Sequence, residues 1–132
     1  MKIWIAGASG MLGSELASKL SSHDLLLTGR SDLDISNENA VLNFCKQNKP
    51  DTVINSAAFT NVDACETEKE VAWRVNAWGC RNLALACNTV GTRLVNISTD
   101  YVFEGDGSRP YHEFDIANGG QTVYGQTKFA GE

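Results

Sequence analysis

The chain has 132 residues, of which 42% are hydrophobic and 20% charged, and its formal net charge is −5. This size and balance are typical of one folded domain and exclude a disordered chain. The negative charge argues against nucleic acid or a membrane surface as a partner, so any bound phosphate must be held by backbone N–H groups or a few cations. No apolar run approaches the roughly 20 residues of a membrane span, and we expect a cytoplasmic protein.

Four cysteines are spread through the chain, at positions 45, 65, 80 and 87. They show neither a C-x-x-C spacing nor paired histidines, which argues against a metal site. We therefore expect reduced thiols in the protein core.

Apolar periodicity predicts that strands and helices alternate along the chain. Strands are expected at residues 2–6, 24–28, 52–55 and 93–97, with a very short one at 33–35. After the first strand, Leu12, Leu16 and Leu20 recur every four residues, which predicts a helix with one apolar stripe. Short buried strands separated by helices predict a doubly wound, parallel α/β sheet of the Rossmann type with about five strands.

Capping residues define the other predicted helices. Ser36 is expected to cap the second helix. Thr67 and Glu70 form a capping-box pattern, which predicts a long helix that ends at Gly91. Residues 98–120 are polar and rich in glycine, and they predict a long loop before a final helix.

A glycine-rich turn separates the first strand from the first helix. Gly7, Gly10 and Gly13 form the pattern G-x-x-G-x-x-G in the strand-to-helix context that dinucleotide binding requires. Glycines permit the tight turn and the close approach of a pyrophosphate, and the helix amino terminus supplies N–H groups. The alternative is a turn whose glycines serve packing alone.

Arg30 follows the second strand, where dinucleotide folds place the adenosine ribose. An arginine at this position accepts a 2′-phosphate, and the hydroxyl of Ser31 could assist it. The sequence therefore favours NADPH as the cofactor. Asp32 lies close enough to leave NADH open as a second cofactor, and a surface arginine without a ligand is the alternative interpretation of Arg30.

Tyr124 and Lys128 form a Y-x-x-x-K pair on the last predicted helix, one turn apart on the same face. Reduction of a ketone needs an acid for the carbonyl oxygen, and a nearby lysine cation stabilises the phenolate that a tyrosine acid leaves. Thr99 follows the last strand, at the sheet edge where ligands bind in such folds. Its hydroxyl could orient a substrate carbonyl, or it could simply cap a turn.

Together these motifs resemble the extended short-chain dehydrogenase/reductases and, within them, the dTDP-4-dehydrorhamnose reductase family. The narrower resemblance is carried by three segments, namely PDTVINSAAFTNVD at 50–63, STDYVFEG at 98–105 and YGQTKFAGE at 124–132. It implies NADPH-dependent reduction of the 4-keto group of dTDP-4-dehydro-6-deoxy-L-mannose, to give dTDP-L-rhamnose. It also implies a catalytic trio of Thr99, Tyr124 and Lys128. The cofactor contacts that it implies are Gly7, Gly10, Met11, Leu12, Gly13, Arg30, Asp34, Ile35, Ala57, Ala58, Tyr124 and Lys128.

The chain departs from the family in length. The family continues well beyond the tyrosine–lysine helix, whereas this chain ends at Glu132. The resemblance therefore implies that residues 1–132 form an NAD(P)-binding Rossmann domain and that the carboxy-terminal domain for the nucleotide sugar is absent. Two possibilities stay open for this domain alone, namely activity and cofactor binding without turnover. An uncovered sheet edge also predicts pairing of two copies as a homodimer.

Two other functions are compatible with the motifs. The regulatory subunit of methionine adenosyltransferase resembles the chain in its dinucleotide framework and in the sequence Ser-Thr-Asp-Tyr-Val-Phe, and it acts by binding a partner enzyme. A nucleotide-sugar epimerase or dehydratase of the same superfamily would need a tightly held NAD and an additional base. The retained Tyr124 and Lys128 favour a reductase over the binding subunit.

Overall fold

A computed structural model describes residues 1–105, 107 and 109–132. Its four strands are β1 (Lys2–Ala6), β2 (Asp24–Thr28), β3 (Thr52–Asn55) and β4 (Arg93–Asn96). All of them pair in parallel, in the order β2-β1-β3-β4. The order places the first strand of the chain inside the sheet, which is the Rossmann-type α/β arrangement that the sequence predicts.

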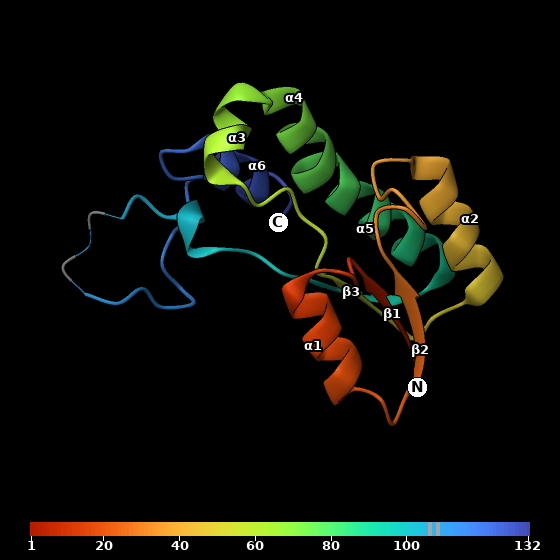
Figure 1. Cartoon of the computed structure of the whole chain (residues 1–132). Helices are drawn as coiled ribbons and strands as arrows, with labels where there is room; N and C mark the ends of the chain where they lie inside the picture. The colour runs from red at the N-terminus through yellow and green to blue at the C-terminus, as the bar shows by residue number, and fades with distance from the viewer. Residues whose placement is uncertain (106, 108) are drawn as a thin grey trace.

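Helices cover both faces of this sheet. They are α1 (Met11–Lys19), α2 (Glu38–Asn48), α3 (Val62–Thr67), α4 (Lys69–Ala72), the π-helical turn η1 (Trp73–Trp78), α5 (Gly79–Val90), the 3-10 turn η2 (Asp100–Val102) and α6 (Val123–Phe129). Figure 1 shows α1 on one face of the sheet, while α2 and α5 pack together over the other. The prediction of a doubly wound fold is therefore confirmed. Within the described ranges, none of the helices is both long enough and apolar enough to cross a bilayer.

The predicted fifth strand at residues 33–35 is wrong, and the described residues form four strands instead of about five. The Asp34 side chain accepts hydrogen bonds from the Ser36 backbone N–H at 2.9 Å and from the Ser36 hydroxyl at 2.7 Å. Such a local side-chain turn competes with strand pairing. Because the Ser36 hydroxyl is used there, the cap of α2 falls to Asn37, whose Oδ1 accepts from the Ala40 N–H at 3.1 Å.

The capping box predicted at Thr67 is also wrong. Thr67 ends α3, and its hydroxyl donates to the Ala64 carbonyl at 3.2 Å. The cap in this region is Asn61, which begins α3 by accepting from the Ala64 N–H at 3.0 Å. The long helix begins at Lys69 and runs through α4, η1 and α5. Its predicted end is confirmed, because Gly91 adopts the left-handed conformation with φ of 74°.

Trp4 of β1 is the centre of the core between the sheet and helices α2 and α5. Its side chain is fully buried, and its ring lies 4.6 Å from that of Phe44 on α2. The indole N–H donates to the hydroxyl of Thr28 on β2 at 2.8 Å, so this buried polar group is satisfied. The cysteines at positions 45, 65, 80 and 87 are buried free thiols, as the sequence predicts.

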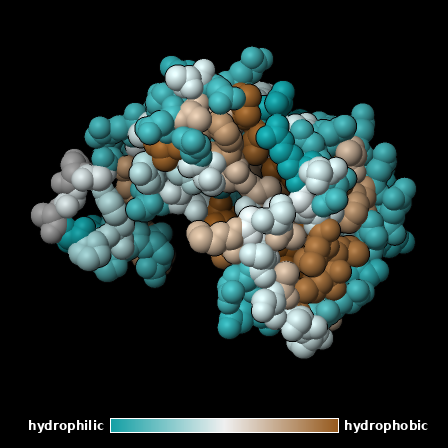
Figure 2. Space-filling model, viewed as in Figure 1, coloured by the Kyte–Doolittle hydropathy of each residue, from teal (hydrophilic) through white to brown (hydrophobic). Residues whose placement is uncertain are grey.

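The α1 face of the sheet is covered less completely. Leu27 on β2 and Val95 on β4 lie in one row across the sheet with Ile5 and Ile54. Leu27 is 49% exposed and Val95 is 41% exposed. Figure 2 shows the resulting apolar surface over β2. The homodimer expected from an uncovered edge stays a prediction.

Thr28→Val is expected to lower the free energy of unfolding by about 1–3 kcal/mol, because it leaves the Trp4 indole N–H buried without a partner. Valine has the same shape and suits a strand, so packing is preserved. Urea denaturation measures the change. Thr89→Val is the matched control, since that exposed hydroxyl bonds only the Leu85 carbonyl one turn back. Equal costs for the two variants would contradict the role given to the indole bond.

Candidate functional site

The glycine turn after β1 is a backbone cradle. Gly7 has a φ of +84°, and its N–H donates to the Thr28 carbonyl at 2.8 Å. A Cβ on Gly7 would lie 2.6 Å from the Ala57 nitrogen, and one on Gly13 would lie 2.2 Å from the Gly7 carbonyl oxygen. Within the described chain no side chain caps α1 at Gly10. The turn therefore presents backbone N–H groups at the amino terminus of α1, an arrangement that suits a phosphate.

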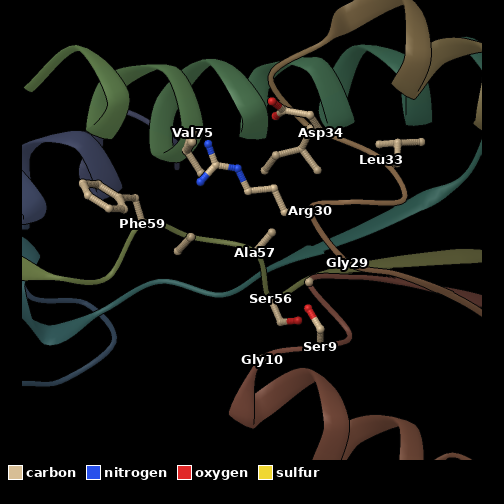
Figure 3. Close-up of a pocket in the computed structure, with 13 residues that line it drawn as sticks. Ser9, Gly10, Gly29, Arg30, Leu33, Asp34, Ser56, Ala57, Phe59 and Val75 are labelled. Carbon is tan, nitrogen blue, oxygen red and sulfur yellow. The ribbon is translucent and has the colours of Figure 1, made fainter. Parts of the chain in front are cut away.

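A cleft of about 190 Å³ opens beside this cradle (Figure 3). Seven of its lining residues are among those the sequence predicts to contact the cofactor, namely Gly7, Gly10, Arg30, Asp34, Ile35, Ala57 and Ala58. They come from the ends of β1 and β3 and from the segment that follows β2. The parallel sheet brings these segments together at the carboxyl ends of its strands.

Some predicted cofactor residues do not line the cleft. Met11 is 92% exposed on α1 and Leu12 also faces solvent, whereas Gly13 is buried beneath the turn. Conversely, sequence reasoning missed six lining residues, which are Ser9, Gly29, Leu33, Ser56, Phe59 and Val75. Ser9 and Gly29 lie within segments whose motifs point to the site. Phe59 and Val75 carry no local signal, because only the path of the chain brings them to the cleft.

Charges of both signs gather where the segment after β2 lines the cleft. Burial by itself would raise the pKa of Asp34, but hydrogen bonds from Ser36 and the positive charges of Arg30 and Arg74 lower it below its ordinary value. Asp34 is therefore ionised at neutral pH. In Figure 3 the Arg30 side chain extends along the cleft toward Val75.

A second hollow contains Thr99. It is lined by residues of the β4–η2 connection, the loop before α6 and the end of the chain, namely Ser98, Thr99, Asp100, Val102, Phe103, Glu113, Asp115, Ala117 and Glu132. The Thr99 oxygen accepts from the Tyr101 N–H at 3.3 Å, and its hydroxyl lies 3.2 Å from the Asp100 carboxylate. Thr99 thus caps η2, which confirms that interpretation, and it also lines the hollow, while its role toward a substrate carbonyl stays a prediction.

The predicted pair Tyr124 and Lys128 lies on α6 beside the 97–101 segment. The ring of Tyr124 meets that of Tyr101 edge-on, with centroids 5.4 Å apart. The Lys128 ammonium donates to the Ile97 carbonyl at 2.6 Å, and its side chain is buried. Burial lowers the pKa of Lys128, although Cys80 and Glu132 oppose this shift. Because these two contacts flank Thr99 in sequence, the predicted trio lies in one region.

In the described ranges no hydrogen bond joins the Tyr124 hydroxyl to Lys128. The lysine is held by the backbone of the strand end instead. The helix itself is fixed at its start, where Thr122 caps it and the Glu66 carboxylate accepts from the Val123 N–H at 2.8 Å. Tyr124 therefore sits on a helix that other elements hold in place.

Phe59 connects the cleft to the predicted catalytic residues. It lines the cleft and also packs, with Tyr124, against the small apolar cluster of Cys65, Ala72 and Val123. Asn76 on η1 holds this junction. Its Oδ1 accepts from the Phe59 N–H at 2.7 Å, and its Nδ2 donates to the Thr127 hydroxyl at 3.1 Å. The cradle, Phe59 and the Ile97 carbonyl that binds Lys128 all follow the carboxyl ends of strands, so they lie along the same edge of the sheet.

Known proteins share this sequence pattern and fold. The family described as RmlD substrate binding domain matches residues 1–132. A dTDP-4-dehydrorhamnose reductase of Streptomyces griseus is 48% identical over 97% of this chain and 42% of its own length.

Solved structures of reductases share the fold of this chain. A dTDP-4-dehydrorhamnose reductase of Clostridium acetobutylicum superposes with a TM-score of 0.96 at 47% identity, over 99% of this chain and 47% of its own. One from Bacillus anthracis, solved in complex with NADP, has a TM-score of 0.93 at 39% identity, over 98% and 47%. The chain thus spans less than half the length of these relatives. Because the family match extends over every residue, the chain belongs to the RmlD substrate binding domain family.

Proposed function

We propose that residues 1–132 form the NAD(P)-binding Rossmann domain of a reductase that uses NADPH on the 4-keto group of a nucleotide-linked 6-deoxy sugar, converting dTDP-4-dehydrorhamnose to dTDP-L-rhamnose. The observation that carries the proposal is the shared position of Phe59, which lines the cofactor cleft and packs in one cluster with Tyr124. The names of the relatives support the substrate, and the NADP complex of the Bacillus anthracis protein supports the cofactor.

The residues of the cleft fit a dinucleotide. A Cβ on Gly7 would collide with the Ala57 backbone and one on Gly13 with the turn itself, so only glycine lets the turn pack tightly enough to bring its N–H groups to the cleft. N–H groups at the start of α1 would hold the pyrophosphate. Arg30 would accept the 2′-phosphate, and Ala57 and Ala58 would line the adenosine side.

The chemistry divides between the cofactor and the chain. When bound, NADPH would supply hydride to the C4 carbon of the sugar. The Tyr124 hydroxyl would donate its proton to the carbonyl oxygen, so that the ketone becomes an alcohol. The Lys128 cation, one helical turn away, would stabilise the phenolate that remains. The Thr99 hydroxyl would orient the carbonyl.

The test has two parts. The purified chain is titrated with NADPH while the fluorescence of Trp4, Trp73 and Trp78 is recorded, and saturable quenching is expected. Residues 1–132 are then exchanged for the matched segment of the Streptomyces griseus reductase, and oxidation of NADPH with dTDP-4-dehydrorhamnose is followed. Formation of dTDP-L-rhamnose is the expected result. Binding without turnover in the exchanged protein would reject the reductase and favour a binding subunit.

A further inference from the structure

The long helix is docked against the segment that follows β2. Asn82 Nδ2 donates to the Ile35 carbonyl at 3.0 Å, and Arg81 pairs with Glu38 at 3.2 Å. Gly79 lies so close to Ile35 that a Cβ would be 2.6 Å from its Cδ1. These contacts fix which face of the helix looks toward residues 30–38.

The helix also reaches the cofactor cleft, through the π-helical turn η1. Val75 of η1 lines the cleft, and Figure 3 shows it opposite the end of the Arg30 side chain. Arg74 is its neighbour in the chain, seven residues before Arg81. Arg74 is exposed, and in the described ranges neither its side chain nor that of Arg30 forms a hydrogen bond or an ion pair. Among the described residues, the Arg30 guanidinium thus lines the cleft without a partner, and the unpaired Arg74 side chain starts from the residue next to a second lining residue, Val75.

One oxygen of each nearby carboxylate accepts hydrogen bonds from its own loop. Asp32 Oδ2 accepts from the Gly29 N–H at 2.7 Å, and Asp34 Oδ1 accepts from the Ser36 N–H and hydroxyl. Burial raises the pKa of Asp34, whereas the Ser36 hydrogen bonds and the positive charges of Arg30 and Arg74 lower it, and the net pKa lies below the ordinary value. Arg74 is therefore close enough to act on the same group as Arg30, and neither carboxylate neutralises it through a direct ion pair.

We infer that Arg74 is a specificity-determining residue, which together with Arg30 binds the 2′-phosphate of NADPH. This inference rests on the proposed function. The two arginines approach from different elements, Arg30 from the end of β2 and Arg74 from η1. A phosphate placed between them would receive charge-assisted hydrogen bonds from two planar forks, whereas NADH offers only a hydroxyl at that position. Asp34 would keep both guanidinium groups near the rim before the cofactor binds.

The experiment is calorimetric titration of the purified chain with NADPH and with NADH. Arg74→Gln is expected to weaken NADPH binding about ten-fold and NADH binding less than about two-fold, because only NADPH carries the extra phosphate. Arg74→Lys keeps the charge and is expected to retain an intermediate preference. Arg81→Gln is the matched control: it removes an arginine from the same helix, but one paired with Glu38, and both affinities should stay unchanged.

The outcomes separate the two proposals. Equal effects of Arg74→Gln on NADPH and NADH, or no effect on either, would overturn the role of Arg74 while the proposed function stands. A wild-type chain that binds neither dinucleotide would overturn the proposed function and this inference together.

Discussion

Replacing Tyr124 by phenylalanine is expected to slow keto-sugar reduction by at least about 100-fold, because the proton for the carbonyl oxygen loses its donor. Phenylalanine keeps the ring, so the contact with Tyr101 and the cluster around Cys65 and Val123 remain. The loss should therefore fall on kcat, with little change in the unfolding midpoint. The measurement is steady-state oxidation of NADPH by the protein in which residues 1–132 replace the matched segment of the Streptomyces griseus reductase.

Tyr101→Phe provides the comparison for this result. Its ring packs edge-on against that of Tyr124, and the substitution likewise removes one phenol hydroxyl. We expect its kcat to stay within about three-fold of wild type, because a hydroxyl outside the proton path contributes far less than a general acid. Similar rates for wild type and Tyr124→Phe would show that another group protonates the substrate.

Gly7→Ala is expected to reduce the free energy of unfolding by about 3 kcal/mol or more, and to abolish NADPH binding. The alanine would adopt an unfavourable left-handed conformation, and its Cβ would also collide with the Ala57 backbone at 2.6 Å. Neither partner can yield easily, since the Cβ position is fixed by the backbone at residue 7 and the atom it meets belongs to the Ala57 backbone. Urea denaturation and the NADPH titration measure the two losses.

Gly91→Ala separates the cost of the left-handed conformation from the cost of the steric collision. Gly91 has a similar φ of +74°, but nothing lies within 4 Å of a Cβ built there. Only the conformational cost of about 1 kcal/mol should appear, and NADPH binding should persist. If both glycine variants lost the same stability, the close approach of the cradle to Ala57 would have no energetic significance.

The sequence predicts the parts of the fold that depend on local pattern. The strands expected at residues 2–6, 24–28 and 52–55 have those bounds in the structure, because each is a short apolar run between polar turns. The glycine cradle is likewise visible in the sequence, since its spacing reflects the turn it makes. Gly91 ends the long helix for the same local reason.

The remaining features depend on contacts between distant residues. The Asn76 side chain is buried and bonds Phe59 and Thr127, which lie 17 and 51 residues away, so the sequence alone indicates only a polar helix residue. The contact of Lys128 with the Ile97 carbonyl depends on how α6 docks. No strand forms at 33–35, because the hydrogen bonds from Ser36 to the Asp34 side chain stabilise a turn and the apolar run there is short.

The place of β1 in the middle of the sheet has a consequence for biosynthesis. Both of its neighbours are translated later, and the second of them is complete only at Asn55. Until then the nascent polypeptide holds an apolar segment with at least one open hydrogen-bonding edge, and parallel pairing across such long chain separations is slow. Chaperones that shield newly made chains should therefore matter most during synthesis of this first portion.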